Sequence, residues 1–207
     1  MTKKTIELKA IAPKTMTVVI EGTSDLILNK MNAHTVRTLT SERKDKAKNL
    51  DKPNEWEQII TSIQWLNGTP TEFSEEGIKR AFVENKPCLS AFGLKKSFGE
   101  AVVRNEIDKY KTKFDANVNI VAPNGLVPIT FEEWTVDEKL MSPKKGAPVL
   151  TKLNRFMKWQ AEITIQFLDN VYSDEQILNI VNLAGFGIGI GSGRSSGYGR
   201  YHVVGVS

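Results

Sequence analysis

Residues 157–167 read Met-Lys-Trp-Gln-Ala-Glu-Ile-Thr-Ile-Gln-Phe, in which apolar and polar residues alternate strictly. A period of two is typical of a β-strand that packs one face and leaves the other exposed. Ser173 follows, with Gln176 three residues later, which is the capping-box pattern that begins a helix. An apolar stripe continues this helix to Gly185, a normal helix stop. The stretch therefore predicts a strand followed by a helix.

Similar patterns lie on both sides of this stretch. Alternation predicts strands over about 16–21, 113–121, 155–168 and 199–206. Helices are predicted over about 90–104, with Ser90 as its cap, and 173–184. Strand, helix, strand, strand, helix, strand is the βαββαβ order of a ferredoxin-like (RRM-like) fold, an α+β fold with an antiparallel sheet and two helices on one face.

Two large insertions interrupt this order, at about 23–88 and about 123–152. We expect the first to hold a helix from Asn54 to Leu66 and a second helix from Ser74 to Glu84. The second contains a basic, mobile loop rich in proline and glycine. A chain of 207 residues can bury one good core, and no linker divides it, so the sequence predicts a single domain over residues 1–207.

Composition restricts the setting in which the chain works. Cys88 is the single cysteine, so no internal disulfide can form. No apolar run approaches the roughly 18 residues of a membrane span. The start, Met1-Thr2-Lys3-Lys4, leads into an alternating pattern rather than a continuous apolar segment, so no secretion signal is evident. We therefore expect a cytoplasmic protein without a membrane partner.

Positive charge is concentrated in two stretches. The net charge of +4 and the pI near 9.0 are weak indicators by themselves. Residues 139–158 contain no acidic residue and six cations, and residues 30–52 hold seven cations diluted by three acids. Either stretch alone is as typical of a solvated surface as of a binding site. Together they favour a polyanionic partner. The six cations of the first stretch are Lys139, Lys144, Lys145, Lys152, Arg155 and Lys158.

A glycine-rich stretch follows the second helix. Residues 185–199 read Gly-Phe-Gly-Ile-Gly-Ile-Gly-Ser-Gly-Arg-Ser-Ser-Gly-Tyr-Gly, so seven of the fifteen are glycine. Glycine at this density exposes backbone N–H groups, as anion-binding loops do. No Gly-Lys-Ser/Thr follows, which excludes a Walker A loop. The helix-to-strand context is the reverse of a dinucleotide fingerprint.

A helix, a glycine-rich loop with an arginine, and a last strand together resemble the RAMP superfamily of CRISPR RNA-binding proteins. The matching residues are 184–195 and 197–200, within a resemblance that covers residues 88–207. The phrase at 182–191, preceded by Trp159, also looks like a family of uncharacterised phage proteins, which would place the chain in a bacterial host. The resemblance implies an RNA-binding surface over the sheet and loop, and stacking of copies along a strand as a homo-oligomer.

We therefore expect non-catalytic binding of RNA, or alternatively of single-stranded DNA. Arg194 and Arg200 would contact phosphate, while Tyr198 and Phe186 are candidates for stacking on bases. The expected contact residues are Gly189, Gly191, Gly193, Arg194, Ser195, Gly197, Tyr198, Gly199, Arg200, Lys95, Lys96, Lys144, Lys145, Lys152, Arg155 and Lys158.

Two other functions stay open. Some RAMP proteins cut RNA with a histidine, and a metal-independent endoribonuclease of this kind would use His202 or His34. Alternation turns His202 away from the core, and Cys88 and Ser90 have no local activating motif. One cysteine and two histidines cannot build a zinc site by themselves, so neither metal nor cofactor is expected. A phage structural or interaction protein, whose glycine loop merely permits tight packing, is the other alternative.

Overall fold

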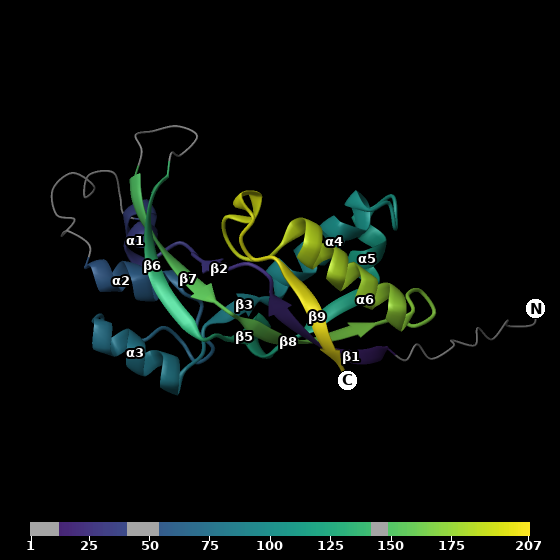
Figure 1. The fold of residues 1–207 in the computed structure, drawn as a ribbon, viewed down its shortest axis with the longest axis horizontal. Helices are drawn as coiled ribbons and strands as arrows, with labels where there is room; N and C mark the ends of the chain where they lie inside the picture. Colours follow the sequence, from purple (N-terminus) through teal and green to yellow (C-terminus); the bar gives the residue numbers. More distant parts are fainter. Residues whose placement is uncertain (1–12, 41–53, 142–148) are drawn as a thin grey trace, which may run out of the picture.

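A computed structural model describes residues 13–40, 54–141 and 149–207. Over these residues the fold is α+β, with two antiparallel sheets (Figure 1). The larger sheet has the order β3-β5-β8-β1-β9, and β4 also pairs with β8. Its strands are β1 (Lys14–Gly22), β3 (Cys88–Ser90), β4 (Val118–Val121), β5 (Leu126–Thr130), β8 (Gln160–Phe167) and β9 (Tyr201–Val206).

Most of the alternating stretch forms β8, so the predicted strand is confirmed, and β8 lies at the centre of this sheet. β8 buries Ala161, Ile163, Ile165 and Phe167, and pairs with β1 from Lys14↔Phe167 to Glu21↔Gln160. α4 (Ala91–Arg104) and α6 (Asp174–Leu183) contribute their apolar faces to the same core cluster. Figure 1 shows these two helices together at the end of the molecule opposite α1, α2 and α3.

Both predicted caps of the core helices are confirmed. Ser90 Oγ accepts a hydrogen bond from the Gly93 N–H at 3.3 Å. Ser173 Oγ accepts from the Gln176 N–H at 3.2 Å, and the Gln176 side chain accepts from the Ser173 N–H at 2.9 Å. The predicted stop at Gly185 is wrong, because the chain continues as a π-helical turn, η2 (Ala184–Ile188).

The strand predicted over 113–121 is half wrong. Its first part is a helix, α5 (Lys111–Asn117), and only β4 is extended. Phe114 and Val118 are buried, whereas Ala116 is exposed. Buried residues four positions apart fit one helical turn as well as they fit alternation, so the sequence pattern was ambiguous here.

The strand predicted over 155–168 is two strands. β7 (Val149–Met157) and β8 meet at Lys158, whose φ of 50° bends the chain. β7 belongs to the smaller sheet, of order β2-β7-β6, with β2 (Leu26–Leu28) and β6 (Glu133–Met141). The expected basic loop at 123–152 is therefore largely a β6–β7 hairpin. Lys144 and Lys145 lie outside the described residues.

The first insertion holds three helices over the described residues: α1 (Ala33–Thr40), α2 (Glu55–Ser62) and α3 (Glu75–Glu84). α3 matches its prediction. α2 begins as predicted, with Asn54 as its cap, but ends earlier than Leu66 because Ile63 is already extended, with ψ of 141°.

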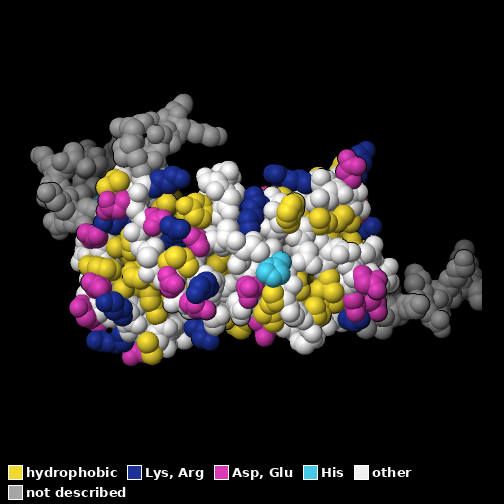
Figure 2. All heavy atoms as spheres, in the orientation of Figure 1, with side chains coloured by type: hydrophobic (Ala, Val, Ile, Leu, Met, Phe, Trp, Pro, Cys, Tyr) yellow, Lys and Arg dark blue, Asp and Glu magenta, His cyan; other side chains and the backbone are white. Residues whose placement is uncertain are grey.

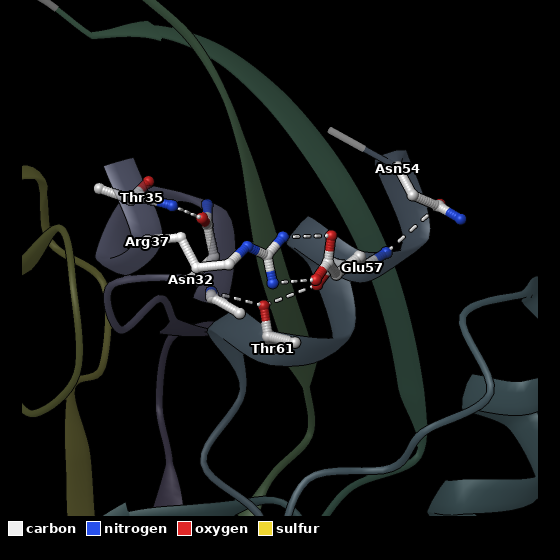
Figure 3. A network of polar contacts seen from close by, with 7 residues as sticks. Asn32, Thr35, Arg37, Asn54, Glu57 and Thr61 are labelled. Carbon is white, nitrogen blue, oxygen red and sulfur yellow. Dashed lines mark hydrogen bonds and ion pairs between the residues drawn. The ribbon is translucent and has the colours of Figure 1, made fainter. Parts of the chain in front are cut away.

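A polar network joins α1 to α2 (Figure 3). The Arg37 guanidinium donates to both carboxylate oxygens of Glu57, at 2.7 and 2.9 Å. This hydrogen bond to Arg37 lowers the pKa of Glu57. Thr61 Oγ accepts from the Ala33 N–H at 3.0 Å and donates to the Glu57 carbonyl at 2.7 Å. The network thus fixes α1 on α2.

Asn154 ties the β6–β7 hairpin to α2. Its fully buried amide nitrogen donates to the Ile59 carbonyl at 3.0 Å and to Ser62 Oγ at 2.8 Å. Its oxygen accepts from Trp134 Nε1 at 3.1 Å. The hairpin position is therefore set by a satisfied buried amide.

β9 lies at one edge of the larger sheet, and α6 partly covers that edge. The Val203 N–H donates to the Asn182 side-chain oxygen at 3.0 Å. Along β9, Tyr201 is buried while His202 and Val204 are exposed, as alternation predicted. Among the helices of the described ranges, none is both long and apolar enough to cross a membrane.

Candidate nucleic-acid interface

The glycine segment, residues 185–200, is fastened to itself and to its neighbours. The Ile190 N–H donates to the Gly199 carbonyl at 2.9 Å, which closes the segment on itself. The Ser192 N–H donates to the Ile27 carbonyl and the Gly199 N–H to the Asp25 carbonyl, each at 2.8 Å. The segment is therefore held against β2 and the turn before it.

Close backbone packing explains several of its glycines. A β-carbon at Gly199 would lie 1.9 Å from the Ile190 carbonyl oxygen, and one at Gly185 would lie 2.1 Å from the Tyr201 carbonyl oxygen. Gly199 also has a φ of +68°, which side chains disfavour. Gly187 and Gly197 differ, because a β-carbon there meets nothing within 4 Å.

Eight of the sixteen N–H groups of the segment are bonded within the protein, besides any within the π-helical turn. We expected the N–H groups to be exposed to an anion, and for these eight the structure corrects that expectation. What charge the segment offers comes from arginine side chains. The bonded donors are the N–H groups of Gly189, Ile190, Ser192, Ser196, Gly197, Tyr198, Gly199 and Arg200.

Two adjoining hollows flank the segment, and we call them together the basic groove. One, of about 230 Å³, lies among β2, the start of α4 and the segment, and its cations are Lys30, Lys96 and Arg194. The other, of about 350 Å³, is lined by Arg104, Arg194 and Arg200. Arg194 lines both hollows, so they adjoin at this residue. Among all their lining residues the one acid is Glu100.

The cations of the basic groove have few counter-charges. Arg194 Nη1 is 3.4 Å from a Glu100 oxygen. Within the described ranges, no carboxylate pairs with Lys30, Lys96 or Arg104. Arg200 Nη1 is buried, and no described residue accepts a hydrogen bond from it. Partial burial lowers the pKa of Lys30, because its ammonium loses water without gaining a described acidic neighbour.

Lys152, Arg155 and Lys158 are paired instead, whereas no described carboxylate pairs with Lys139 of β6. Lys152 contacts Glu138 at 2.9 Å and also Glu55. Arg155 contacts Asp25 at 2.5 Å and Asp137 at 3.2 Å, and Lys158 contacts Glu132 at 2.6 Å. Hydrogen bonds to these carboxylates raise the pKa of all three cations. Figure 2 shows basic and acidic side chains intermingled over this half of the molecule.

The remaining predicted contact residues are distributed unevenly. Lys96, Arg194, Ser195 and Arg200 line the basic groove. Lys95 points away, since its ammonium donates to the Asp115 carbonyl at 2.8 Å and to Asn119 Oδ1 at 2.9 Å.

The two stacking candidates also differ. Phe186 is 85% exposed, at the π turn. Tyr198 is half-buried and lines a third hollow, against the β6–β7 hairpin. Lys139 and Leu153 line the same hollow, so the glycine segment and the basic 139–158 segment meet there.

The open face of the larger sheet does not fit a phosphate-binding surface. Opposite the helices, β1 and β8 present mainly threonine and glutamine side chains together with Glu21 and Glu162. Neither strand places a lysine or arginine on that face between Thr15 and Glu21 or between Gln160 and Gln166. The cations instead gather beside the glycine segment.

Neither histidine candidate lines the basic groove, whereas Cys88 and Ser90 line its first hollow. His202 is exposed on β9 as the cross-strand partner of Glu21. His34 is in α1, where its charge helps to lower the pKa of Glu57. Burial raises the pKa of the Cys88 thiol to about 11, and Ser90 serves as the cap of α4. The described residues hold no group of three or more His, Cys, Asp or Glu that could bind a metal.

Sequence reasoning missed Lys30 and Arg104 as members of the basic groove. Lys30 lies just after β2, and Arg104 ends α4. Nothing local in the sequence places these two residues near Arg194, because the packing of β2 and α4 around the glycine segment brings them together.

Comparisons with known proteins give fold likenesses alone. No protein-family model and no curated protein sequence matches the chain. Among solved structures, Cmr6 from Pyrococcus furiosus is similar with a TM-score of 0.42 and 10% identity, over 94% of this chain and 100% of that one. A chain of the Type III-B Cmr-beta complex bound to cognate target RNA is similar with a TM-score of 0.47 and 12% identity, over 93% of this chain and 59% of that one.

With TM-scores below 0.5, neither likeness bears on what this chain binds. The expected phage kinship stays a prediction.

Proposed function

We propose that this protein binds single-stranded nucleic acid, with RNA preferred, through the basic groove and without catalysis. The observation that carries the proposal is the lining of the two hollows, in which five cations face one carboxylate and Arg194 belongs to both. Five cations with one carboxylate among them suit a chain of phosphates better than a single small anion. The five cations are Lys30, Lys96, Arg104, Arg194 and Arg200.

The electrostatics favour binding because little has to be broken first. A phosphate that approaches Lys30 or Lys96 displaces no ion pair with a described residue. For Lys30, a phosphate would also supply the opposite charge that its partly buried ammonium lacks. Arg200 Nη1 has a donor to offer, since no described residue uses it. Hydrogen bonds between guanidinium and phosphate are among the stronger ones in proteins.

We propose further that β1, α4, β4, β8, α6 and β9 constitute a ferredoxin-like core. Their order along the chain is βαββαβ. The antiparallel pairing β9–β1–β8–β4 supports this assignment, since the first and third strands of the motif lie at its centre.

Fluorescence anisotropy with labelled single-stranded RNA and DNA, measured across a salt series, tests the proposal. The slope of log K against log salt is expected to be about −0.7 for each phosphate that the protein neutralises. Lys96→Gln/Arg104→Gln removes two groove charges, and Lys79→Gln/Lys113→Gln removes two charges elsewhere as a matched control. The groove variant should lower the affinity and make the salt slope less steep, and the control variant should change neither. Absence of binding at low salt overturns the proposal.

The same samples separate the alternatives. Copies that stack along a strand, as the resemblance implies, would bind longer oligonucleotides cooperatively. Cleavage of labelled RNA in EDTA that disappears in His202→Ala or His34→Ala would instead identify a ribonuclease. Oligomers that survive nuclease treatment and carry no nucleic acid would favour a structural protein.

A further inference from the structure

The third hollow, on the hairpin side of the glycine segment, differs from the basic groove in chemistry. It has a volume of about 420 Å³, and its apolar walls are Ile27, Val136, Leu153 and the half-buried Tyr198. This volume lies within the roughly 300–1,000 Å³ of small-molecule sites in proteins. Ile27 also lines the first hollow of the basic groove, so the two sites adjoin.

Tyr198 is held in this hollow by the conformation of the glycine segment. Gly193 has a φ of +72°, and a β-carbon there would lie 2.9 Å from Tyr198 Cδ2. The ring therefore packs closely on a position where a side chain would displace it. Because Arg194 follows Gly193 directly, the same turn presents a cation to the basic groove and an aromatic ring to the third hollow.

The polar lining of this hollow includes an acceptor that is not fully used. Asp137 Oδ2 binds Arg155 Nη1 at 3.2 Å, and Glu138 Oε1 binds Lys152 Nζ at 2.9 Å. Asp137 lies on the strand face of its cross-strand partner Leu153, whereas Glu138 lies on the opposite face, with Lys152 and Glu55. The second oxygen of Asp137 has no partner among residues 13–40, 54–141 and 149–207. Lys139, on the same face as Asp137, also lines the hollow. Carboxylates would repel a phosphate but can accept hydrogen bonds from amino groups.

We propose that this hollow takes one nucleobase of the bound strand, stacked against Tyr198, and prefers bases with an exocyclic amino group over uracil. The inference rests on the proposed function, since the basic groove would hold the adjoining phosphates. An aromatic ring stacks on any base, so Tyr198 supplies affinity without selectivity. Asp137 supplies the selectivity, because cytosine and adenine offer N–H donors where uracil offers a carbonyl oxygen.

Matched pairs of bases test the inference on the unaltered protein. Single-stranded RNA oligonucleotides of equal length, composed of cytidine or of uridine, differ in the amino group at the base edge. Adenosine and purine riboside form a second such pair. In anisotropy at one salt concentration, the amino-bearing member of each pair is expected to bind about fivefold more tightly, as one added hydrogen bond allows. Equal affinity within both pairs overturns the selectivity.

Variants then assign the two roles. Tyr198→Ala is expected to weaken cytidine and uridine oligonucleotides alike, by about 5- to 100-fold, whereas Tyr198→Phe keeps the stacking ring and should bind as the parent does. Asp137→Asn introduces an amide donor and is expected to bring the cytidine-to-uridine affinity ratio to about one. Unchanged binding in Tyr198→Ala, with its fold verified by circular dichroism, overturns the stacking.

Failure of this inference is distinguishable from failure of the proposed function. If RNA binding depends on salt but not on base identity or on Tyr198, the proposal of the basic groove stands and that of the base site is wrong. Absence of binding by every oligonucleotide removes both.

Discussion

The basic groove and the β6–β7 hairpin are both rich in cations, but they differ in how many have a carboxylate partner. Four of the five groove cations have none among the described residues, whereas Lys152, Arg155 and Lys158 each have at least one. In the hairpin, strand register sets acids beside bases: Glu138 is the direct cross-strand partner of Lys152. In the groove the cations come from the end of β2, from α4 and from the glycine segment, and Glu100 is the one acid in its lining. The density of basic residues along a sequence therefore says less about available charge than the elements that carry them.

Removing positive charge from the basic groove has the largest expected effect. Lys30→Gln/Lys96→Gln/Arg104→Gln is expected to weaken single-stranded RNA binding about a thousandfold at low salt, because three charged contacts to phosphate are lost. The slope of log K against log salt should become less steep by about 2. Anisotropy across a salt series measures both quantities.

The matched hairpin variant is Lys152→Gln/Arg155→Gln/Lys158→Gln, which removes the same charge. It should keep most of the affinity and the slope, because these cations already have carboxylate partners. Its stability should fall instead, because Arg155 pairs with both Asp25 and Asp137 and its loss leaves these two carboxylates without a cation among the described residues. If both triple variants lose affinity equally, the contrast between the regions is wrong.

Two glycines sharpen the comparison from inside the glycine segment. Gly199→Ala is expected to lower the free energy of unfolding by about 3 kcal/mol, because its φ is positive and its β-carbon would overlap the Ile190 carbonyl. Gly187→Ala meets open space and should stay within about 0.5 kcal/mol of the parent. Urea denaturation measures both.

The position of Gly187 gives this pair a second use. Because Gly187 lines the basic groove, Gly187→Leu should reduce RNA affinity while leaving stability nearly unchanged. A large loss of stability in Gly187→Leu would mean that the π-helical turn itself requires glycine at this position.

Asn154 tests what holds the hairpin in place. Asn154→Ala leaves the Ile59 carbonyl and the Trp134 N–H without their buried partner, so we expect a loss of about 2 kcal/mol. Thermal unfolding followed by tryptophan fluorescence would report it. If the surface ion pairs alone fixed the hairpin, this variant would unfold at the same temperature as the parent.

The smallest expected effect concerns pH. Arg37 lowers the pKa of Glu57 below its model-peptide value of 4.5, so the pair stabilises the fold above that pH. The contribution is lost as the pH falls through the lowered pKa of the folded state. The difference in melting temperature between the parent and Arg37→Gln should therefore be present at neutral pH and shrink in acid. A difference that stays constant down to strongly acidic pH would contradict the sign.

Local patterns allowed the elements at the centre of the fold to be predicted. β8, α4, α6 and β9 follow from alternation, helical stripes and capping residues, all of which depend on neighbours in sequence. The errors occur where local patterns are ambiguous, as at Phe114 and Val118, or where a single backbone angle decides, as at Lys158.

The site was predicted only in part for the same reason. Arg194, Arg200 and Lys96 were singled out, because glycine density and helix faces are visible in the sequence. Pairing of Arg155 with Asp25 joins residues 130 positions apart, and no local signal reveals it.

The hydrogen bond between Asn182 and the Val203 N–H has a consequence for self-association. An edge strand with free backbone groups is a template on which another chain can add a strand. Here a side-chain amide from α6 already occupies one of those groups, at 3.0 Å. A chain that extended the sheet at β9 would first have to displace that amide, so growth of β-sheet aggregates from this edge is disfavoured at its first step.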